Sequence, residues 1–126
     1  LRKDAVSIFE AGVKAADPVT AVVNHLGRKG DILDVAGEKY DLSKFENVYI
    51  IGMGKAAASM ALAVEGVLGE RLTSGIVNVK YGHTAPLGKV EINEAGHPLP
   101  DEAGLGGARK IIDLLRGTGE NDLVIC

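Results

Sequence analysis

The sequence has a single cysteine, Cys126, among its 126 residues. One thiol cannot form an internal disulfide, nor can it supply the several thiolates of a structural zinc cluster. The chain also lacks any apolar run that approaches the ~20 residues needed to span a membrane. We therefore expect a cytoplasmic protein without disulfides and without a membrane partner.

Positive charge is also in short supply, with 14 basic residues against 17 acidic ones. A dedicated nucleic-acid binder normally shows a basic stripe, so we do not expect a nucleic-acid partner. The charges are unevenly distributed, however. Residues 71–90 contain Arg71, Lys80, His83 and Lys89 but no aspartate or glutamate.

The length suits one domain with a substantial core. Glycine accounts for 17 residues, about twice its usual share of roughly 7%, which fits an α/β fold with several tight, ligand-facing turns. The chain starts at Leu1 and ends in the apolar run 122–126, which resembles an interrupted strand. We expect residues 1–126 to be the N-terminal part of a longer enzyme, with a few residues also missing at the start.

Several segments show helical spacing, with apolar residues recurring every three to four positions. Aspartates precede two of the segments as N-caps, Asp17 ahead of Pro18 and Asp101 ahead of the last helix. The predicted helices cover residues 2–16, 18–26, 55–68 and 101–116. For the last helix, the inward face is predicted to consist of Leu105, Ala108, Ile112 and Leu115.

Strand-like segments alternate with these helices. Residues 32–43, with Ala36-Gly37-Glu38 at their centre, are expected to form a short hairpin or an extended arm. The main strands are predicted at residues 47–52, 75–80, 89–94 and 122–126. Alternating strands and helices predict a doubly wound, largely parallel, Rossmann-like sheet flanked by helices, present here as a partial domain.

The most informative segment joins the first main strand to its helix. Strand-like residues run into Gly52 and Gly54, Lys55 follows at once, and an alanine-rich helix begins. Glycines allow a tight turn and let backbone N–H groups approach a ligand, while a helix start carries partial positive charge. We call residues 52–55 the glycine–lysine turn and predict that it binds an anion, either phosphate or carboxylate.

The glycine–lysine turn nominally matches the dinucleotide fingerprint G-x-G-x-x-G/A, with Ala57 as the last residue. That fingerprint also needs an acidic residue at the end of the next strand to bind the ribose hydroxyls. Here the strand ends at Lys80-Tyr81, which disfavours NAD but leaves NADP open. The turn does not supply the Gly-x4-Gly-Lys-Ser/Thr of Walker loops. A tight turn with a solvated lysine is the alternative without a ligand.

Two further polar clusters follow main strands, at residues 80–83 and 94–102. Open α/β sheets bind ligands at the carboxyl ends of their strands. We therefore predict that Lys80 and His97 contact phosphate or substrate at the same sheet edge as Lys55; for His97 a turn-stabilising hydrogen bond is an equal alternative. For Tyr81 and His83 an ordinary polar loop is an equal alternative, and His25 is expected to be a surface or core residue.

Taken together, residues 51–60, 79–83 and 94–102 resemble, in order and spacing, the N-terminal domain of the glycerate 2-kinases. This MOFRL-type glycerate kinase family includes members often labelled hydroxypyruvate reductase, and the resemblance covers essentially the whole chain. It implies transfer of the ATP γ-phosphate to the 2-hydroxyl of (R)-glycerate, giving 2-phosphoglycerate, with Mg²⁺. In the family, a Rossmann-like domain and a smaller C-terminal domain enclose the active site.

The resemblance matches the lysine of the family's Gly-x-Gly-Lys-Ala motif to Lys55, which is the expected catalytic residue. Gly52, Gly54, Lys80 and His97 are the expected substrate- or phosphate-binding residues. No metal ligand is assigned within the chain. By the resemblance, the chain stops at Cys126 before the family's glycine- and serine-rich loop, the C-terminal domain is absent, and the Mg²⁺ ligands and any base are expected in that absent part. Residues 1–126 alone are therefore expected to be inactive.

The expected partners are glycerate and a nucleotide, and homo-oligomerisation stays open. Whether Lys55 contacts the nucleotide or glycerate is also open.

Two other classes of function use the same turn. An NAD(P)H-dependent hydroxypyruvate reductase would bind a pyrophosphate there, and a sugar-phosphate-binding regulatory domain would bind its ligand without chemistry. Consumption of ATP, consumption of reduced cofactor, or ligand binding alone separates the three.

Overall fold

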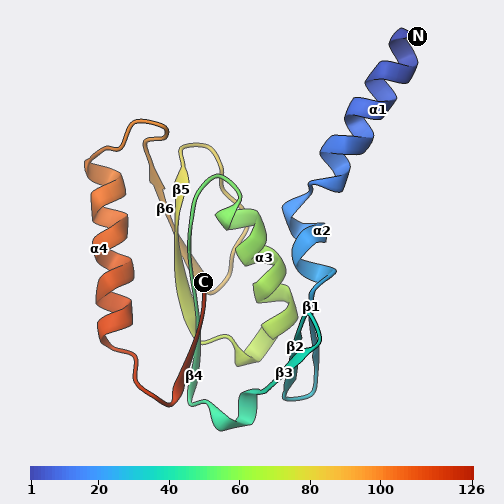
Figure 1. Ribbon diagram of the computed structural model, residues 1–126. Coiled ribbons are helices and arrows are strands. Elements are labelled where there is room, and N and C mark those ends of the chain that lie inside the picture. Colours follow the sequence, from blue (N-terminus) through green and yellow to red (C-terminus); the bar gives the residue numbers. More distant parts are fainter.

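The computed structural model describes all 126 residues, and its centre is a parallel sheet of four strands (Figure 1). The strands lie in the order β6-β5-β4-β7, and every neighbouring pair is parallel. Their bounds are β4 (Asn47–Met53), β5 (Ser74–Lys80), β6 (Val90–Ala95) and β7 (Asp122–Ile125). The four predicted main strands are thus confirmed to within one or two residues.

Helices cover both faces of this sheet, as a doubly wound fold requires (Figure 1). Helix α3 (Ala57–Leu68) packs on β4 and β5, and α4 (Glu102–Arg116) packs on β5 and β6 from the opposite side. The predicted fold class, a largely parallel α/β sheet flanked by helices, is confirmed.

The strand order reverses direction once. From β4 the chain moves outward through α3 to β5 and then to β6, and α4 carries it back to β7 on the other side of β4. The two windings therefore diverge between β4 and β7. In open α/β sheets such a topological switch point is where ligands bind, beyond the carboxyl ends of the strands.

The main core lies on the α3 face of the sheet. Alternate residues of β5 point to opposite faces, so Val77 and Val79 join this core while the side chain of Asn78 faces α4. Helix α3 contributes mainly alanines, which let its backbone come close to the strands. The core comprises Leu33, Leu42, Val48, Ile50, Ala57, Ala58, Ala61, Val64, Leu68, Leu72, Val77, Val79 and Val90.

The predicted inward face of α4 is wrong. Leu105 and Ile112 are 46% and 48% exposed, whereas the buried residues of the helix are Gly107 and Ile111. Glycines cause the difference between the predicted and the observed face. A hydrophobic pattern ignores glycines, although they allow the helix to approach the sheet most closely. A Cβ at Gly107 would lie 2.7 Å from Oδ1 of Asn78, so α4 rests on the sheet through its glycines.

Two asparagines complete the contact between α4 and the sheet. The Asn93 amide donates to Oδ1 of Asn78 (2.8 Å) and to the carbonyl of Ala103 (2.9 Å). The Asn78 amide in turn donates to the carbonyl of Gly104 (3.0 Å). Half-buried amides need such partners, since an unsatisfied polar group costs about 1–3 kcal/mol. The sheet therefore binds the first turns of α4 through hydrogen bonds of Asn78 and Asn93 rather than through apolar packing.

The connection from β5 to β6 contains no helix. Its nine residues, Tyr81 to Lys89, must run back along a six-residue strand of about 20 Å, which nine helical residues (about 14 Å) would not cover. Oε1 of Glu65 on α3 accepts from the backbone N–H groups of Gly88 (2.8 Å) and Lys89 (3.0 Å). The ammonium of Lys89 donates to the carbonyl of Leu72 (2.8 Å). This extended connection is thus anchored to the C-terminal half of α3 and to the turn that leads into β5.

A separate antiparallel sheet precedes the main one. The predicted hairpin is confirmed as β2 (Ile32–Val35) and β3 (Glu38–Asp41), followed by a 3₁₀ turn at Leu42–Lys44. The prediction missed a third strand, β1 (Leu26–Lys29), and wrongly extended the preceding helix to Leu26. The exposed Gly-Arg-Lys of β1 shows no apolar alternation, so only its pairing with β2 makes it a strand.

The N-terminal helices are confirmed with shorter bounds. Helix α1 (Arg2–Ala15) has no buried residue and projects away from the rest of the chain (Figure 1). Helix α2 (Pro18–Val23) has the predicted cap, because the Asp17 carboxylate accepts from the N–H of Thr20 at 2.7 Å. None of the helices has the length and apolar character needed to cross a membrane.

Adjacent glycines of α4 allow a matched test of its docking. We expect Gly107→Ala to lower the free energy of unfolding by about 1–3 kcal/mol, because the new methyl would overlap the two asparagines. Gly106→Ala is the control: no atom lies within 4 Å of its Cβ position, so it should stabilise by about 0.5–1 kcal/mol. Urea unfolding measures both, and equal shifts would contradict the close helix–sheet contact.

Candidate functional site

A cavity of about 610 Å³ opens at the switch point, where β4 and β7 end and α3 begins. We call it the switch-point cavity. Its walls are mainly apolar, and no aspartate or glutamate lines it. The residues around it are Ile50, Ile51, Gly52, Met53, Gly54, Lys55, Ala56, Ala57, Met60, Ala61, Val64, Val77, His97, Ile125 and Cys126. Four separate chain segments therefore meet where the topology places ligand sites.

The glycine–lysine turn lines part of this cavity, and its two glycines differ in backbone conformation and in the space around them. Gly54 has a φ of 112°, a conformation that side chains disfavour, and its N–H donates to the carbonyl of Asn78 at 2.9 Å. At Gly52 a Cβ would lie 3.4 Å from Cγ1 of Val77 and 3.6 Å from the Cβ of Ala57. Gly54 thus turns the chain, whereas a Cβ at Gly52 would make only ordinary van der Waals contacts.

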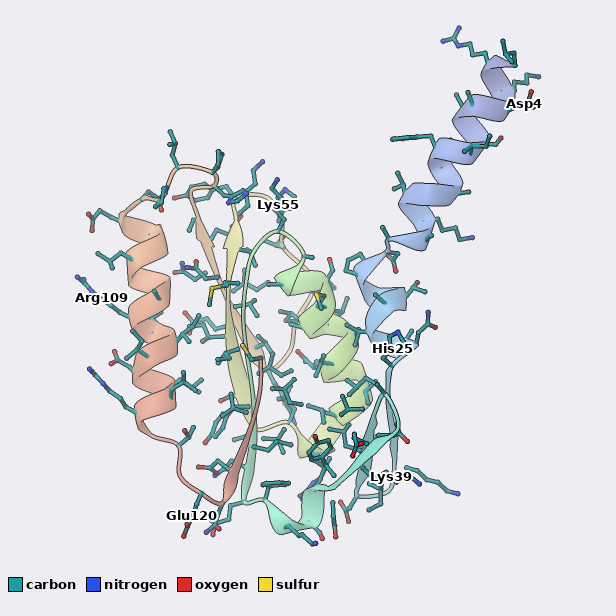
Figure 2. The ribbon with its side chains drawn as sticks, in the orientation of Figure 1. Asp4, His25, Lys39, Lys55, Arg109 and Glu120 are labelled. Atoms are coloured by element: carbon teal, nitrogen blue, oxygen red, sulfur yellow. The ribbon has the colours of Figure 1, made fainter.

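Lys55 lies in this turn, two residues before α3 begins at Ala57, and not within the helix as predicted. The bend at Gly54 delays the helix, because Ala57 first closes a tight turn through its N–H to the Gly54 carbonyl (3.2 Å). The Lys55 side chain is exposed at the carboxyl end of the sheet and forms neither an ion pair nor a hydrogen bond (Figure 2). Its positive charge is therefore available to a ligand.

His97 also lines the switch-point cavity, as expected from its position after β6. Lys80 does not line it. Lys80 ends β5 and pairs in register with Ala95, and its side chain is half-buried. The structure therefore brings together Gly52, Gly54, Lys55 and His97 but leaves Lys80 outside the cavity. A ligand role for Lys80 stays a prediction, as do the roles of the others.

The Asp101 carboxylate caps α4 as predicted and also accepts two further hydrogen bonds. Its Oδ1 accepts from the N–H of Gly104 (2.9 Å), which confirms the cap on α4. Its Oδ2 accepts from the N–H of Gly96 (3.0 Å) and from the hydroxyl of Tyr81 (2.8 Å). The Gly96, Gly104 and Tyr81 bonds all lower the pKa of the Asp101 carboxyl, and the same contact raises the pKa of Tyr81. Local sequence patterns gave no signal for the Tyr81 contact, since it joins loops twenty residues apart.

A second carboxylate ties the same two loops together. Oε1 of Glu94 accepts from the backbone N–H of Gly82 at 2.6 Å, and the N–H of Tyr81 donates to the carbonyl of Ala95 at 3.1 Å. These bonds hold the end of β5 against the end of β6. Glu94 and Asp101 are the acidic residues closest in sequence to His97. Both carboxylates thus accept from backbone N–H groups, Glu94 from Gly82 and Asp101 from Gly96.

Metal binding by this chain depends on whether enough ligand side chains gather in one place. No group of three or more histidine, cysteine, aspartate or glutamate side chains gathers in the way a metal ion requires. The carboxylates next to His97 already accept from backbone N–H groups, as described above. The residues of this chain therefore form no ready-made site with three or more such metal ligands.

Comparison with known proteins places the chain in a family. Residues 4–126 match the family described as a domain of unknown function, DUF4147. A relative named glycerate 2-kinase, from Pyrococcus horikoshii, is 36% identical over 98% of this chain and 27% of its own length. A protein from Agrobacterium vitis, provisionally named hydroxypyruvate reductase, is 40% identical over 94% of this chain and 24% of its own.

Solved structures agree with the fold. A crystal structure of a protein from Pyrococcus horikoshii OT3 covers 98% of this chain and 27% of that one, with a TM-score of 0.83 and 36% identity. The crystal structure of a glycerate kinase from Thermotoga maritima covers 97% and 26%, with a TM-score of 0.72 and 33% identity.

The chain thus spans about a quarter of the length of the curated relatives it matches. Their names include both glycerate kinase and hydroxypyruvate reductase, the two labels that the three sequence motifs indicated. Because the family match extends over all but the first three residues, the chain belongs to the DUF4147 family, whose relatives include proteins named glycerate kinase.

Proposed function

We propose that this chain is part of a glycerate kinase that transfers the γ-phosphate of ATP to the 2-hydroxyl of (R)-glycerate and forms 2-phosphoglycerate. One observation carries the proposal: an unpaired cation, Lys55, stands at an apolar cavity at the switch point of a doubly wound sheet. The names of the relatives at 33–36% identity support the kinase class.

The proposed role of Lys55 follows from the chemistry of phosphoryl transfer, which is mostly positioning and stabilisation of charge. Two unit charges 4 Å apart attract by about 1 kcal/mol in bulk water and about 4 kcal/mol at the effective dielectric constant near a protein surface. The apolar walls of the switch-point cavity favour the second regime. Lys55 would therefore stabilise either the transferring phosphate or the glycerate carboxylate.

The remaining site residues would position the reactants. In this proposal the backbone of Gly52 and Gly54 approaches the anion, and His97, which lines the same cavity, donates to a substrate or phosphate oxygen. Lys80 would act at longer range, since it lies outside the cavity. Mg²⁺, when bound, neutralises charge on the ATP phosphates. Its ligands and any base for the 2-hydroxyl would come from residues outside 1–126.

A reductase acting on hydroxypyruvate is the second candidate, favoured by the name of the Agrobacterium vitis relative at 40% identity. The same turn would then bind a pyrophosphate. Strand β5 ends at Lys80-Tyr81, where a dinucleotide site needs an acid for the ribose hydroxyls, so NADPH fits this candidate better than NADH. A lysine beside paired glycines suits a transferring phosphate better than an unreacting one, which favours the kinase.

The first functional prediction concerns Lys55. In a full-length protein that contains this chain, Lys55→Ala should lower kcat for glycerate phosphorylation about a hundredfold or more, because it removes preorganised charge stabilisation. Lys55→Arg should also impair turnover, since the guanidinium group is bulkier and differently hydrated. Steady-state kinetics measures both.

Lys39→Ala is the matched control, because Lys39 lies on β3, away from the switch-point cavity (Figure 2). It should leave kcat and KM unchanged. Unfolding midpoints of all three variants should stay near the unmodified protein, because neither lysine forms an ion pair. Normal turnover in a folded Lys55→Ala protein would eliminate Lys55 as the catalytic residue.

The second functional prediction separates kinase from reductase. With (R)-glycerate, ATP and Mg²⁺, the full-length protein should form ADP and 2-phosphoglycerate, and a chelator should stop the reaction. The product position is read by phosphorus NMR, which distinguishes the 2- from the 3-phosphate. In parallel, hydroxypyruvate with NADPH or NADH should give no oxidation of the cofactor. Rapid cofactor oxidation without ADP formation would replace the kinase by the reductase.

A further inference from the structure

The loop that carries His97 is closely packed around Gly96. A Cβ at Gly96 would lie 2.5 Å from the carbonyl oxygen of Leu99 and 3.0 Å from Oδ2 of Asp101. Prolines at 98 and 100 restrict the backbone further. The chain therefore folds back on itself immediately beside His97, and Asp101 closes the loop.

The two oxygens of Asp101 have separate tasks. Oδ1 caps α4 through the N–H of Gly104, whereas Oδ2 faces the loop and accepts from Gly96 N–H and the Tyr81 hydroxyl. Gly96 is the residue directly before His97. The hydrogen bond from its N–H to Asp101 therefore fixes the backbone position from which the His97 side chain extends. Tyr81 comes from the neighbouring loop after β5, which is itself tied to β6 by the Glu94–Gly82 bond.

We infer that Asp101 and Tyr81 are positioning residues that hold His97 at the switch-point cavity for substrate binding. This inference rests on the proposed function and deepens it, because it names what keeps the histidine in place. His97 itself is exposed and its imidazole has no hydrogen-bond partner within the chain, so its position depends on its backbone. Bonds to an ionised acceptor are roughly twice as strong as neutral ones, which makes a carboxylate the effective anchor.

Substitutions can separate this role from capping. Asp101→Asn keeps an oxygen for the cap, and asparagine caps helices as well as aspartate does, but its amide nitrogen cannot accept from Gly96 N–H. Tyr81→Phe removes only the hydroxyl. Tyr40→Phe is the matched control, because Tyr40 is an exposed tyrosine of β3 with no side-chain hydrogen bond.

In the full-length protein, Tyr81→Phe and Asp101→Asn should each raise KM for glycerate or for ATP about two- to tenfold, as expected for one lost hydrogen bond. Because His97 is placed as a binding residue, kcat should change little. Tyr40→Phe should change neither constant. Unfolding midpoints should stay close to the unmodified protein, since the cap is kept. An unchanged KM in both variants would overturn the inference.

A double-mutant cycle identifies His97 as the group being positioned. In a His97→Ala background, Tyr81→Phe should have no further effect on KM, because there is no imidazole left to place. Additive effects of the two substitutions would overturn the inference. Hydrogen exchange of the Gly96 amide, measured by NMR on residues 1–126 or on the full-length protein, should be faster in Tyr81→Phe than in Tyr40→Phe.

The two kinds of failure can be told apart. If the unmodified full-length protein forms no ADP from glycerate and ATP, the proposed function fails. Unchanged Gly96 exchange in Tyr81→Phe overturns the positioning role whatever the reaction is. Active enzyme with unchanged KM in the variants overturns the positioning role alone.

Discussion

Asn78 is the residue on which both the turn and the second helix layer depend. Its backbone carbonyl accepts from the N–H of Gly54, which holds the glycine–lysine turn at the end of β4. Its side chain accepts from Asn93 and donates to the carbonyl of Gly104, which holds α4. Because a half-buried amide must keep its partners, the turn, the sheet and α4 are fixed by one network rather than by three independent contacts.

A second network continues from α4 to the cavity. Gly104 also donates its N–H to Asp101, whose other oxygen reaches Gly96 and Tyr81. A continuous path of hydrogen bonds therefore joins Gly54, which lines the switch-point cavity, to the residue before His97, which also lines it. Rigid support of this kind is what a binding site needs, because small displacements of positioned groups are costly in catalysis.

Sequence patterns predicted this fold well where the signal was local. The main strands, the hairpin turn at Ala36-Gly37 and the caps at Asp17 and Asp101 follow from alternation, glycine and N-cap chemistry. Patterns failed where the deciding contact was distant. The docking face of α4 depends on Gly107 meeting asparagines of two strands, and β1 exists only through its pairing with β2. The cavity beside Lys55 could be anticipated, whereas the Tyr81–Asp101 bond could not.

The placement of the carboxylates near His97 bears on the proposed anion site. Glu94 and Asp101 lie three and four residues from His97 in sequence, and carboxylates directed into the cavity would repel a phosphate or a carboxylate ligand. Each instead accepts backbone N–H groups, and the pKa of Asp101 is lowered because its charge is stabilised by those donors. Because no acid lines the cavity itself, the proposed anion site at Lys55 has no carboxylate in its walls to compete with a ligand. The hydrogen bonds that tie the loops together thus also fix the direction of both carboxylates, each toward backbone N–H groups.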